Sequence, residues 1–345
     1  MIDPEFGIPL AHAGAATAEP VRARLRPPEL PGHDPTDPVE SAVIRGLSRS
    51  WGRRAAVKKD EPDLDAMFEP ALRDFPDRMI PFHNDPRFLA LDEHHRARIG
   101  AWAWIAYNKN VIDIEQHVVN PGFGLITSDV FGLGPHDTVT VGVLQAMVDE
   151  QYHTLMHQNA NSLTRRRRGW AMPDAVLPPC ATVRAHDAAV AHALDLRHAA
   201  LIRLAFTTVA ETSISAYLGL FTGDETVQPV NRSTVAVHRR DELCHSSLAG
   251  ELLTMVFDEL DATERELLLD ALATGIEAFT GNDMDTWAAI VAHEQIPGGQ
   301  AMLADTAAAA AAQPVVQDCT AIRRLCGHLG VEADLVARGP FDHPG

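Results

Sequence analysis

Two short segments of the sequence repeat the same spacing of an acid and a histidine. Glu150 and His153 stand three residues apart in MVDEQYH, and Glu242 and His245 stand three residues apart in RRDELCH. At 100° per residue, the two members of each pair share one face of a helix. The spacing therefore predicts a helix at both places, each with a carboxylate and an imidazole on the same face.

Two further glutamates extend this pattern. Glu115 lies in VIDIEQH and Glu211 in TVAETSIS, so the chain order is Glu, ExxH, Glu, ExxH. A ferritin-like dimetal site takes its ligands in this way: the single-Glu helices supply bridging or terminal carboxylates, and each ExxH helix adds one carboxylate and one imidazole. Because four buried carboxylates would be prohibitive without cations, we predict a dimetal site in a helical bundle.

Apolar residues recur at helical spacing around all four acids. We expect long helices over Asp85 to Val119, ended by Pro121 and Gly122, over Asp137 to Asn159, over His186 to Leu220, and from Pro229 to Leu260 with Asn231 or Ser233 as the cap. Additional helices are expected over Val39 to Trp51, Ala262 to Phe279, Asp283 to Ala312 and Pro314 to Leu329. The fold class predicted is all-α, a ferritin-like four-helix bundle with additional helices.

The chain is expected to divide near residue 38. Residues 1–38 are rich in Pro, Ala, Gly and charge and are interpreted as an irregular arm, in which MIDPEFG reads as a remnant of an expression vector. Residues 39–345 are expected to form one domain.

Composition limits the partners. A formal net charge of −18 would repel nucleic acid, and the one dense basic run, Arg165 to Arg168, is interpreted as a solvated loop. No uninterrupted apolar stretch approaches the roughly 18 residues of a membrane span. Four cysteines without a CxxC pair fit a reducing compartment. We therefore expect a cytoplasmic protein that binds neither nucleic acid nor membrane.

His238 distinguishes between families of dimetal proteins. It lies four residues before Glu242 and seven before His245, on the same helix face, so a third imidazole is available. Ferritins, ribonucleotide reductase small subunits and acyl desaturases match the pattern of four acids and two histidines. The HxxxExxH arrangement instead resembles the p-aminobenzoate N-oxygenase family of diiron proteins, over about Asp85 to Leu260.

The resemblance implies a site and a reaction. It implies that two irons are held by four glutamates and three histidines, namely Glu115, Glu150, His153, Glu211, His238, Glu242 and His245. It further implies an O2-dependent oxidation of an arylamine to hydroxylamine, nitroso or nitro products in natural-product biosynthesis, with electrons from a reductase. Manganese accepts the same donors and remains an alternative metal. The sequence does not decide the oligomeric state, and a homodimer is the assembly to test first.

Residues near the acids are candidates for supporting roles. Tyr107 and Asn110 precede Glu115 by about two turns and one turn and are candidate substrate contacts, with packing as the alternative. By family analogy an arginine near Asn110 would clamp an aminobenzoate carboxylate, so its absence favours a neutral, larger or differently anchored amine. Asp149 and Asp241 either orient the imidazoles or are solvated neighbours.

Several other residues have structural interpretations. His157 is interpreted as a helix-end residue or a neighbour of the ligands rather than an eighth ligand. Cys244 and His117 are expected to be structural, and Glu93, His94 and His95 are not expected to form a second metal site.

Other functions use the same ligands. A ferritin-type protein would oxidise and store iron, but ferritin subunits are about half this length. C–H hydroxylation, desaturation and radical generation are further alternatives, and Tyr217, six residues after Glu211, is a candidate for a radical.

Overall fold

The computed structural model describes residues 42–60, 62–134, 136–221, 223–310, 315–316 and 318–341, except for the side chains of residues 309 and 310. All of them fall within one compact unit, residues 33–345. The predicted arm over residues 1–38, with its vector remnant, lies outside the described residues, and the boundary at residue 38 stays a prediction.

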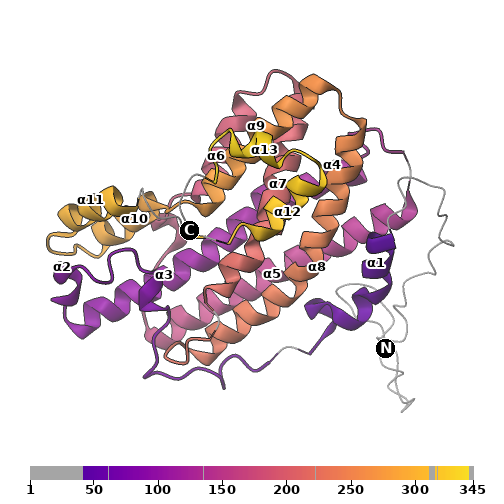
Figure 1. The fold of residues 1–345 in the computed structure, drawn as a ribbon. Coiled ribbons are helices and arrows are strands. Elements are labelled where there is room, and N and C mark those ends of the chain that lie inside the picture. Colours follow the sequence, from indigo (N-terminus) through magenta and orange to yellow (C-terminus); the bar gives the residue numbers. More distant parts are fainter. Residues whose placement is uncertain are drawn as a thin grey trace, which may run out of the picture. The chain divides into compact units, whose positions relative to one another are not determined.

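Four long helices form the centre of this unit (Figure 1). They are α3 (Glu93–Ile114), α5 (Asp137–Arg168), α7 (Leu196–Gly219) and α8 (Pro229–Glu259). α3 packs on α5, α5 on α8, and α8 on α7. The described residues contain no strand beyond an isolated bridge between Arg73 and Val227. The predicted all-α, ferritin-like four-helix bundle is therefore confirmed.

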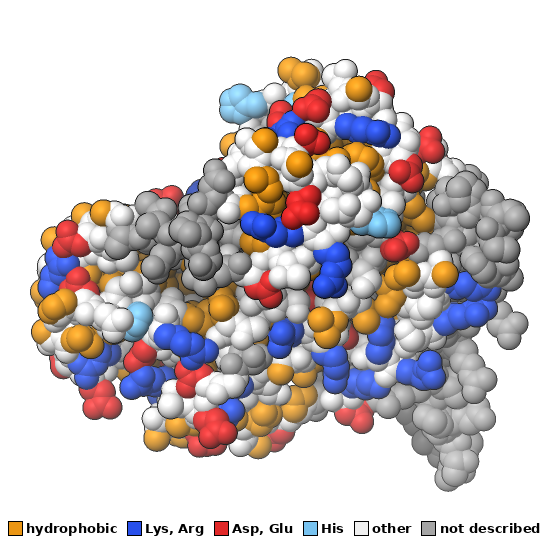
Figure 2. Space-filling view, viewed as in Figure 1, with side chains coloured by type: hydrophobic (Ala, Val, Ile, Leu, Met, Phe, Trp, Pro, Cys, Tyr) orange, Lys and Arg blue, Asp and Glu red, His pale blue; other side chains and the backbone are white. Residues whose placement is uncertain are grey.

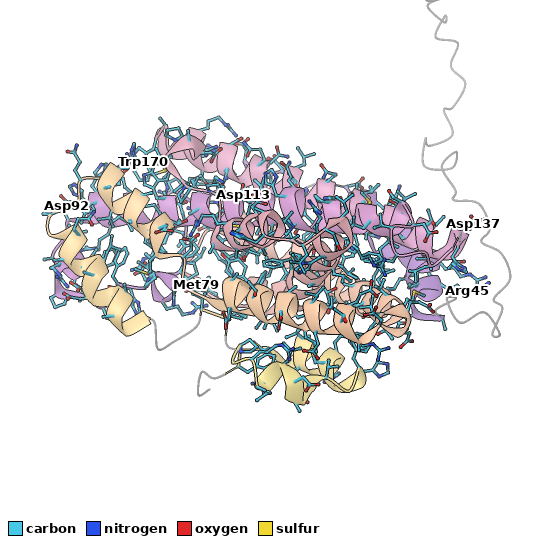
Figure 3. The ribbon with its side chains drawn as sticks, turned by 90° about the horizontal axis from the view of Figure 1, so that it is seen from above. Arg45, Met79, Asp92, Asp113, Asp137 and Trp170 are labelled. Carbon is cyan, nitrogen blue, oxygen red and sulfur yellow. The ribbon has the colours of Figure 1, made fainter. Side chains whose placement is uncertain are left out.

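Helices α3 and α5 run antiparallel. Figure 3 shows Asp92, which precedes α3, near Trp170, which follows α5, at one end of the bundle, and Asp137, where α5 begins, at the other end beside Arg45. The first turn of α3 is capped because the Asp92 carboxylate accepts a hydrogen bond from the His95 backbone N–H at 2.8 Å. A local cap thus sets where α3 begins in the chain.

Shorter helices surround the bundle. They are α1 (Ala42–Arg54), η2 (Ala56–Lys58), η3 (Asp77–Met79), α2 (Pro86–Leu89), η4 (Glu115–Val119), α4 (Asn120–Thr127), η5 (Asp174–Val176), α6 (Ala181–Ala191), α9 (Ala262–Thr280), α10 (Met284–His293), α11 (Gly299–Ala310), α12 (Thr320–His328) and α13 (Glu332–Val336). α1 packs on α5 and α8, whereas α9 packs on α7. Of these, α1, α9, α10, α11 and α12 overlap the segments for which the sequence predicted additional helices.

Two predicted helices are each divided in the structure. The segment from His186 to Leu220 is not one helix, because α6 ends at Ala191 and α7 begins after a new cap, the Asp195 carboxylate, which accepts from the His198 N–H. The segment from Asp283 to Ala312 breaks between α10 and α11, where Gly298 adopts φ +70°.

Three predicted ends were also wrong. The last predicted helix begins at Thr320 rather than Pro314, which lies outside the described residues. The first long helix begins only at Glu93, because α2 and a turn precede it. Asn231 and Ser233 do not cap α8 but lie inside it, after the N-cap residue Gln228.

Pro121 and Gly122 do not end the first long helix. The chain widens into a π-helical turn, η4, and continues as α4 to Thr127. Proline is tolerated because it stands in the first turn of α4, where its missing N–H is not required, and the Asn120 N–H is bonded to the Glu115 carbonyl of the wide turn. The π-turn begins at Glu115 itself, so the prediction failed at a candidate metal ligand.

The arginine run is the last turn of α5 rather than a loop. α5 extends past the predicted end at Asn159 to Arg168, and Gly169 terminates it with φ +68°. Arg168 pairs with Asp74 at 2.9 Å and Arg166 with Asp65 at 2.6 Å. Basic side chains at a helix C-terminus also interact favourably with the helix dipole. These arginines therefore attach the segment around residues 65–74 to the bundle.

No helix among the described residues is both long and apolar enough to cross a lipid bilayer.

The approach of α4 to α7 gives a test of the packing. A Cβ added to Gly122 would lie 1.8 Å from Thr207 Oγ1, whereas one added to Gly124 on the same helix would meet nothing within 4 Å. Gly122→Ala should lower the free energy of unfolding by about 1–3 kcal/mol through overpacking. Gly124→Ala should be neutral or stabilise by up to about 1 kcal/mol, because alanine favours helix. Urea unfolding of both variants checks this, and equal midpoints would contradict it.

Candidate metal centre

The bundle brings the seven predicted ligands together at its centre. Glu115 comes from the start of η4, Glu150 and His153 from α5, and Glu211 from α7. α8 supplies three residues, His238, Glu242 and His245. Each of the seven is at most 2% exposed. Carboxylates this deeply buried are rare unless they are paired or hold a cation.

The seven residues form two overlapping groups whose donor atoms all lie within 4.8 Å of one another. One group is Glu115, Glu150, His153, His238 and Glu242, and the other is Glu150, Glu211, Glu242 and His245. Glu150 and Glu242 belong to both groups. The carboxylates common to both positions therefore come from the two ExxH helices, and the single-Glu helices supply one carboxylate to each position.

The two groups are unequal because His238 belongs to only one of them. Its Nε2 atom lies 2.8 Å from Glu242 Oε1 and 3.7 Å from Glu115 Oε1. The first group thus has two imidazoles and the second has one.

The unused oxygens of the cluster fit cations. Glu115, Glu211 and Glu242 each have one buried oxygen without a hydrogen-bond partner among the described residues, and Glu150 Oε1 lies 2.6 Å from His245 Nδ1 without the geometry of a hydrogen bond. A buried polar atom without a partner costs about 1–3 kcal/mol, and more when it is charged. Hard carboxylate oxygens together with imidazole nitrogens are donors that iron and manganese accept. The donor set therefore suits two metal ions.

Protonation in the cluster reflects the crowding of its charges. Burial, followed by the charge of Glu150, raises the pKa of Glu115 and of Glu211 well above the ordinary value. Burial also disfavours the charged form of Glu242, but the imidazoles of His245 and His238 outweigh it and hold the pKa of Glu242 well below the ordinary value. Without cations, these pKa shifts favour the ionised form of Glu242, one of the two shared carboxylates, and the protonated forms of Glu115 and Glu211.

The histidines show the same competition. Burial favours the neutral form of His153 and His245, but the charge of Glu150 and the other carboxylates around each ring together outweigh burial and raise the pKa of both imidazoles well above the ordinary value. A metal ion entering the cluster would therefore have to displace protons.

Two aspartates connect the ExxH helices crosswise. Asp149 on α5 lies 3.2 Å from His245 Nε2 on α8, and Asp241 on α8 lies 3.5 Å from His153 Nε2 on α5. The other nitrogen of each imidazole, Nδ1, faces Glu150. His245 Nδ1 lies 2.6 Å from Glu150 Oε1, and His153 Nδ1 lies 2.8 Å from Glu150 Oε2. A carboxylate on the outer nitrogen fixes which nitrogen is left to bind a metal.

His238 has a different outer partner. Its Nδ1 lies 2.9 Å from His157 Nε2, and His157 Nδ1 lies 2.5 Å from Asn108 Oδ1. The Asn108 amide is oriented because its Nδ2 donates to Asn161 Oδ1 at 2.6 Å. With the amide placed this way, His157 donates from Nδ1 and its Nε2 accepts from His238 Nδ1–H, which leaves His238 Nε2, on the side of the carboxylates, as the nitrogen available to a metal ion. His157 thus lies behind His238, where it does not face the glutamates.

Some neighbours of the cluster carried no signal in the sequence. The Trp51 indole donates to Asp149 at 2.9 Å, and the Ala56 backbone N–H donates to Asp241 at 2.9 Å. Both lie about 100 residues or more before their partners. No periodicity or motif could have found them, because their contribution depends on how α1 and η2 pack on the bundle.

A cavity lies along α3, and its lining includes Ile114, the residue before Glu115, but none of the seven candidate ligands. It has a volume of about 100 Å³ and is lined by Tyr107, Asn110 and Ile114 of α3, opposite Tyr217 of α7. Tyr107 stacks on Tyr217 with ring centroids 4.8 Å apart, and the buried Tyr107 hydroxyl has no hydrogen-bond partner among the described residues. Both predicted substrate contacts therefore stand on the wall of a cavity.

The cavity wall carries little charge. No Lys, Arg or His side chain is among its described lining residues, and its one carboxylate, Asp283, pairs with Arg184 at 2.9 Å. An anionic substituent buried there would meet no cation.

The remaining candidates lie elsewhere. His117 is exposed, and Cys244 is half-buried. Glu93 and His94 are exposed, and His95 interacts with Asp92 at 2.8 Å. None of these residues belongs to the two groups of donor atoms.

The chain is similar to known proteins over most of its length. The family described as P-aminobenzoate N-oxygenase AurF matches residues 37–330, which include the whole cluster. The 4-aminobenzoate N-oxygenase of Streptomyces thioluteus is 32% identical over 308 residues, which cover 89% of this chain and 90% of that protein. The resemblance noted in the sequence is confirmed, and the chain belongs to the p-aminobenzoate N-oxygenase family.

Proposed function

We propose that this protein is a diiron N-oxygenase that oxidises the amino group of an aromatic amine with O2. The observation that carries the proposal is the pair of donor groups that share Glu150 and Glu242, because shared carboxylates hold two cations side by side. Glu115, His153 and His238 complete one position, and Glu211 with His245 completes the other. Two irons bound there would supply the reduction and activation of O2.

The residues around the irons have three roles in this proposal. Asp149 and Asp241 orient two imidazoles, and His157 orients the third. Trp51 and the backbone of Ala56 hold the aspartates in place. The cavity along α3 would hold the amine, with Tyr107 and Asn110 as the polar groups on its wall.

The cavity supports a small, uncharged substrate. A cavity of roughly 150 Å³ can take up benzene, so about 100 Å³ along α3 is comparable with one aromatic ring. Burying a carboxylate without a cation is costly. We therefore propose an arylamine of one ring without an acidic substituent, oxidised to the hydroxylamine and onward to nitroso or nitro product. Electrons would come from a reductase, and manganese is the alternative metal.

Iron storage and C–H oxidation use the same donors. No observation in the structure favours either one over amine oxidation. Ferric mineral growth would indicate storage, whereas a tyrosyl signal unaffected by amines would indicate radical chemistry at Tyr217.

Metal binding should release protons and weaken as the pH falls. In the metal-free protein the raised pKa values of Glu115, Glu211, His153 and His245 leave protons on groups that must lose them to bind a metal. Lower pH stabilises the protonated cluster, so the affinity for Co2+ should fall from pH 8 to pH 6. Calorimetry in two buffers of different ionisation enthalpy measures the protons released. Glu115→Gln should reduce that number, and binding without proton release would contradict the prediction.

Turnover should depend on both iron and the charge of the amine. Protein loaded with Fe(II) and supplied with O2, ascorbate and a redox mediator should convert methyl 4-aminobenzoate with a kcat/KM about tenfold higher than 4-aminobenzoate, because the free acid buries an unpaired charge. Asn110→Arg should reduce this preference by supplying a cation on the cavity wall. Chromatography of the products measures both. Failure of the iron-loaded protein to oxidise either amine, or any other arylamine offered, would refute the proposed function.

A further inference from the structure

Four basic side chains gather at one place on this acidic protein. Many basic side chains of the described residues are paired with carboxylates, as Arg78 is with Asp224, and others, such as Arg324, are unpaired but do not belong to this group. Arg53, Lys58, Lys59 and Arg240, here called the basic patch, have no carboxylate partner among the described residues. Figure 2 shows Lys and Arg side chains gathered in the lower right of the view, on the side of α1 and α8. On a protein with a formal net charge of −18, these four side chains form a local concentration of positive charge.

The patch is held together by contacts around the end of α1. Lys59 Nζ donates to the Arg53 carbonyl oxygen. Lys58 Nζ lies 4.2 Å from the centroid of the Trp51 ring. Arg53, Lys59 and Arg240 are exposed, and Lys58 is half-buried. The charges therefore face solvent, where they can attract an oppositely charged partner.

A cleft opens in the middle of the patch. It has a volume of about 230 Å³ and lies between the segment after η2, α5 and α8. Lys59, Arg240 and one carboxylate, Asp60, line it together with apolar side chains such as Leu64 and Met156. A surface of this kind, with an apolar hollow among charges, is suited to a protein partner.

The patch covers two short connections to the metal centre. Beneath Lys58, Trp51 donates to Asp149, which lies 3.2 Å from His245. Next to Lys58, the Ala56 N–H donates to Asp241, which lies 3.5 Å from His153. Each connection thus passes from the surface to a ligand imidazole through one aspartate. The substrate cavity is lined by α3, α6 and α7 instead, so a partner on the patch would leave it open.

We propose that the basic patch is the docking site of an acidic electron-transfer protein, which supplies the electrons for amine oxidation. The proposal rests on the proposed function. The first oxidation, R–NH2 + O2 + 2 e− + 2 H+ → R–NHOH + H2O, needs two electrons that neither the amine nor O2 provides. An acidic iron–sulfur protein would deliver them one at a time, steered to the patch by its charge.

The experiment uses an acidic plant-type 2Fe–2S ferredoxin with its reductase as the probe. Its binding to the full-length protein is measured by calorimetry at low and high salt, with and without iron. Arg240→Glu reverses one charge of the patch. The matched control is Arg324→Glu, which reverses an exposed arginine of α12, a helix that packs on α7 and α13. Amine turnover driven by the ferredoxin is divided by turnover driven by ascorbate with a redox mediator, so that general damage cancels.

We expect Arg240→Glu to weaken ferredoxin binding and lower the turnover ratio by about tenfold at low salt, and Arg324→Glu to change neither. Lys59→Glu combined with Arg240→Glu should reduce both further, and added salt should weaken binding of the unaltered protein. A far-ultraviolet spectrum and an unfolding midpoint confirm that each variant is folded.

Several results would overturn the proposal. They are the absence of ferredoxin binding, binding that is insensitive to salt, equal effects of Arg240→Glu and Arg324→Glu, or loss of a homodimer in Arg240→Glu, which would assign the patch to a second copy of the chain. Failure of ascorbate with a redox mediator to support amine oxidation would overturn the proposed function instead, and binding of the ferredoxin to the iron-free protein would still decide whether the patch docks an acidic partner.

Discussion

Four glutamate carboxylates meet at the centre of the bundle, close enough together to share two metal ions. Taking an ion out of water costs several kcal/mol even after relaxation, and the carboxylates repel one another. Partial protonation of Glu115 and Glu211 relieves this in the metal-free protein, whereas cations would relieve it more completely. The surrounding structure has to hold the acids together against their repulsion. The long helices α3, α5, α7 and α8 do so by burying their apolar faces against one another and against α9.

The aspartate and histidine pairs extend this constraint outward. Asp149 of α5 contacts His245 of α8, and Asp241 of α8 contacts His153 of α5. A shift of either helix would therefore disturb both imidazoles. α1 and η2 then fix the aspartates through Trp51 and Ala56. His238 is supported separately, by neutral groups on α5 and α3. The centre therefore has two imidazoles backed by carboxylates and one backed by another imidazole, a difference that arises from side chains outside the ligand set.

The sequence predicted the bundle from helical periodicity and the ExxH pairs from their spacing, whereas the full set of seven candidate ligands came from the resemblance to the p-aminobenzoate N-oxygenase family. The ExxH pairs and His238 each fall on one helix face, and burial of that face follows. What the sequence could not predict depends on contacts between segments far apart in the chain. The sequence analysis ended the first long helix at Pro121 because it did not anticipate the π-turn at Glu115. It also missed the separate helix start at Asp195 and expected Asn231 or Ser233, rather than Gln228, as the cap of α8. Trp51, Ala56 and Asn108 became neighbours of the ligands only through packing.

The most direct test of the account is anomalous diffraction at the iron edge from crystals of the iron-loaded protein. The account predicts two anomalous peaks, one among Glu115, His153 and His238 and the other beside Glu211 and His245, with Glu150 and Glu242 contacting both. A single peak, or two peaks that do not share these two glutamates, would contradict it.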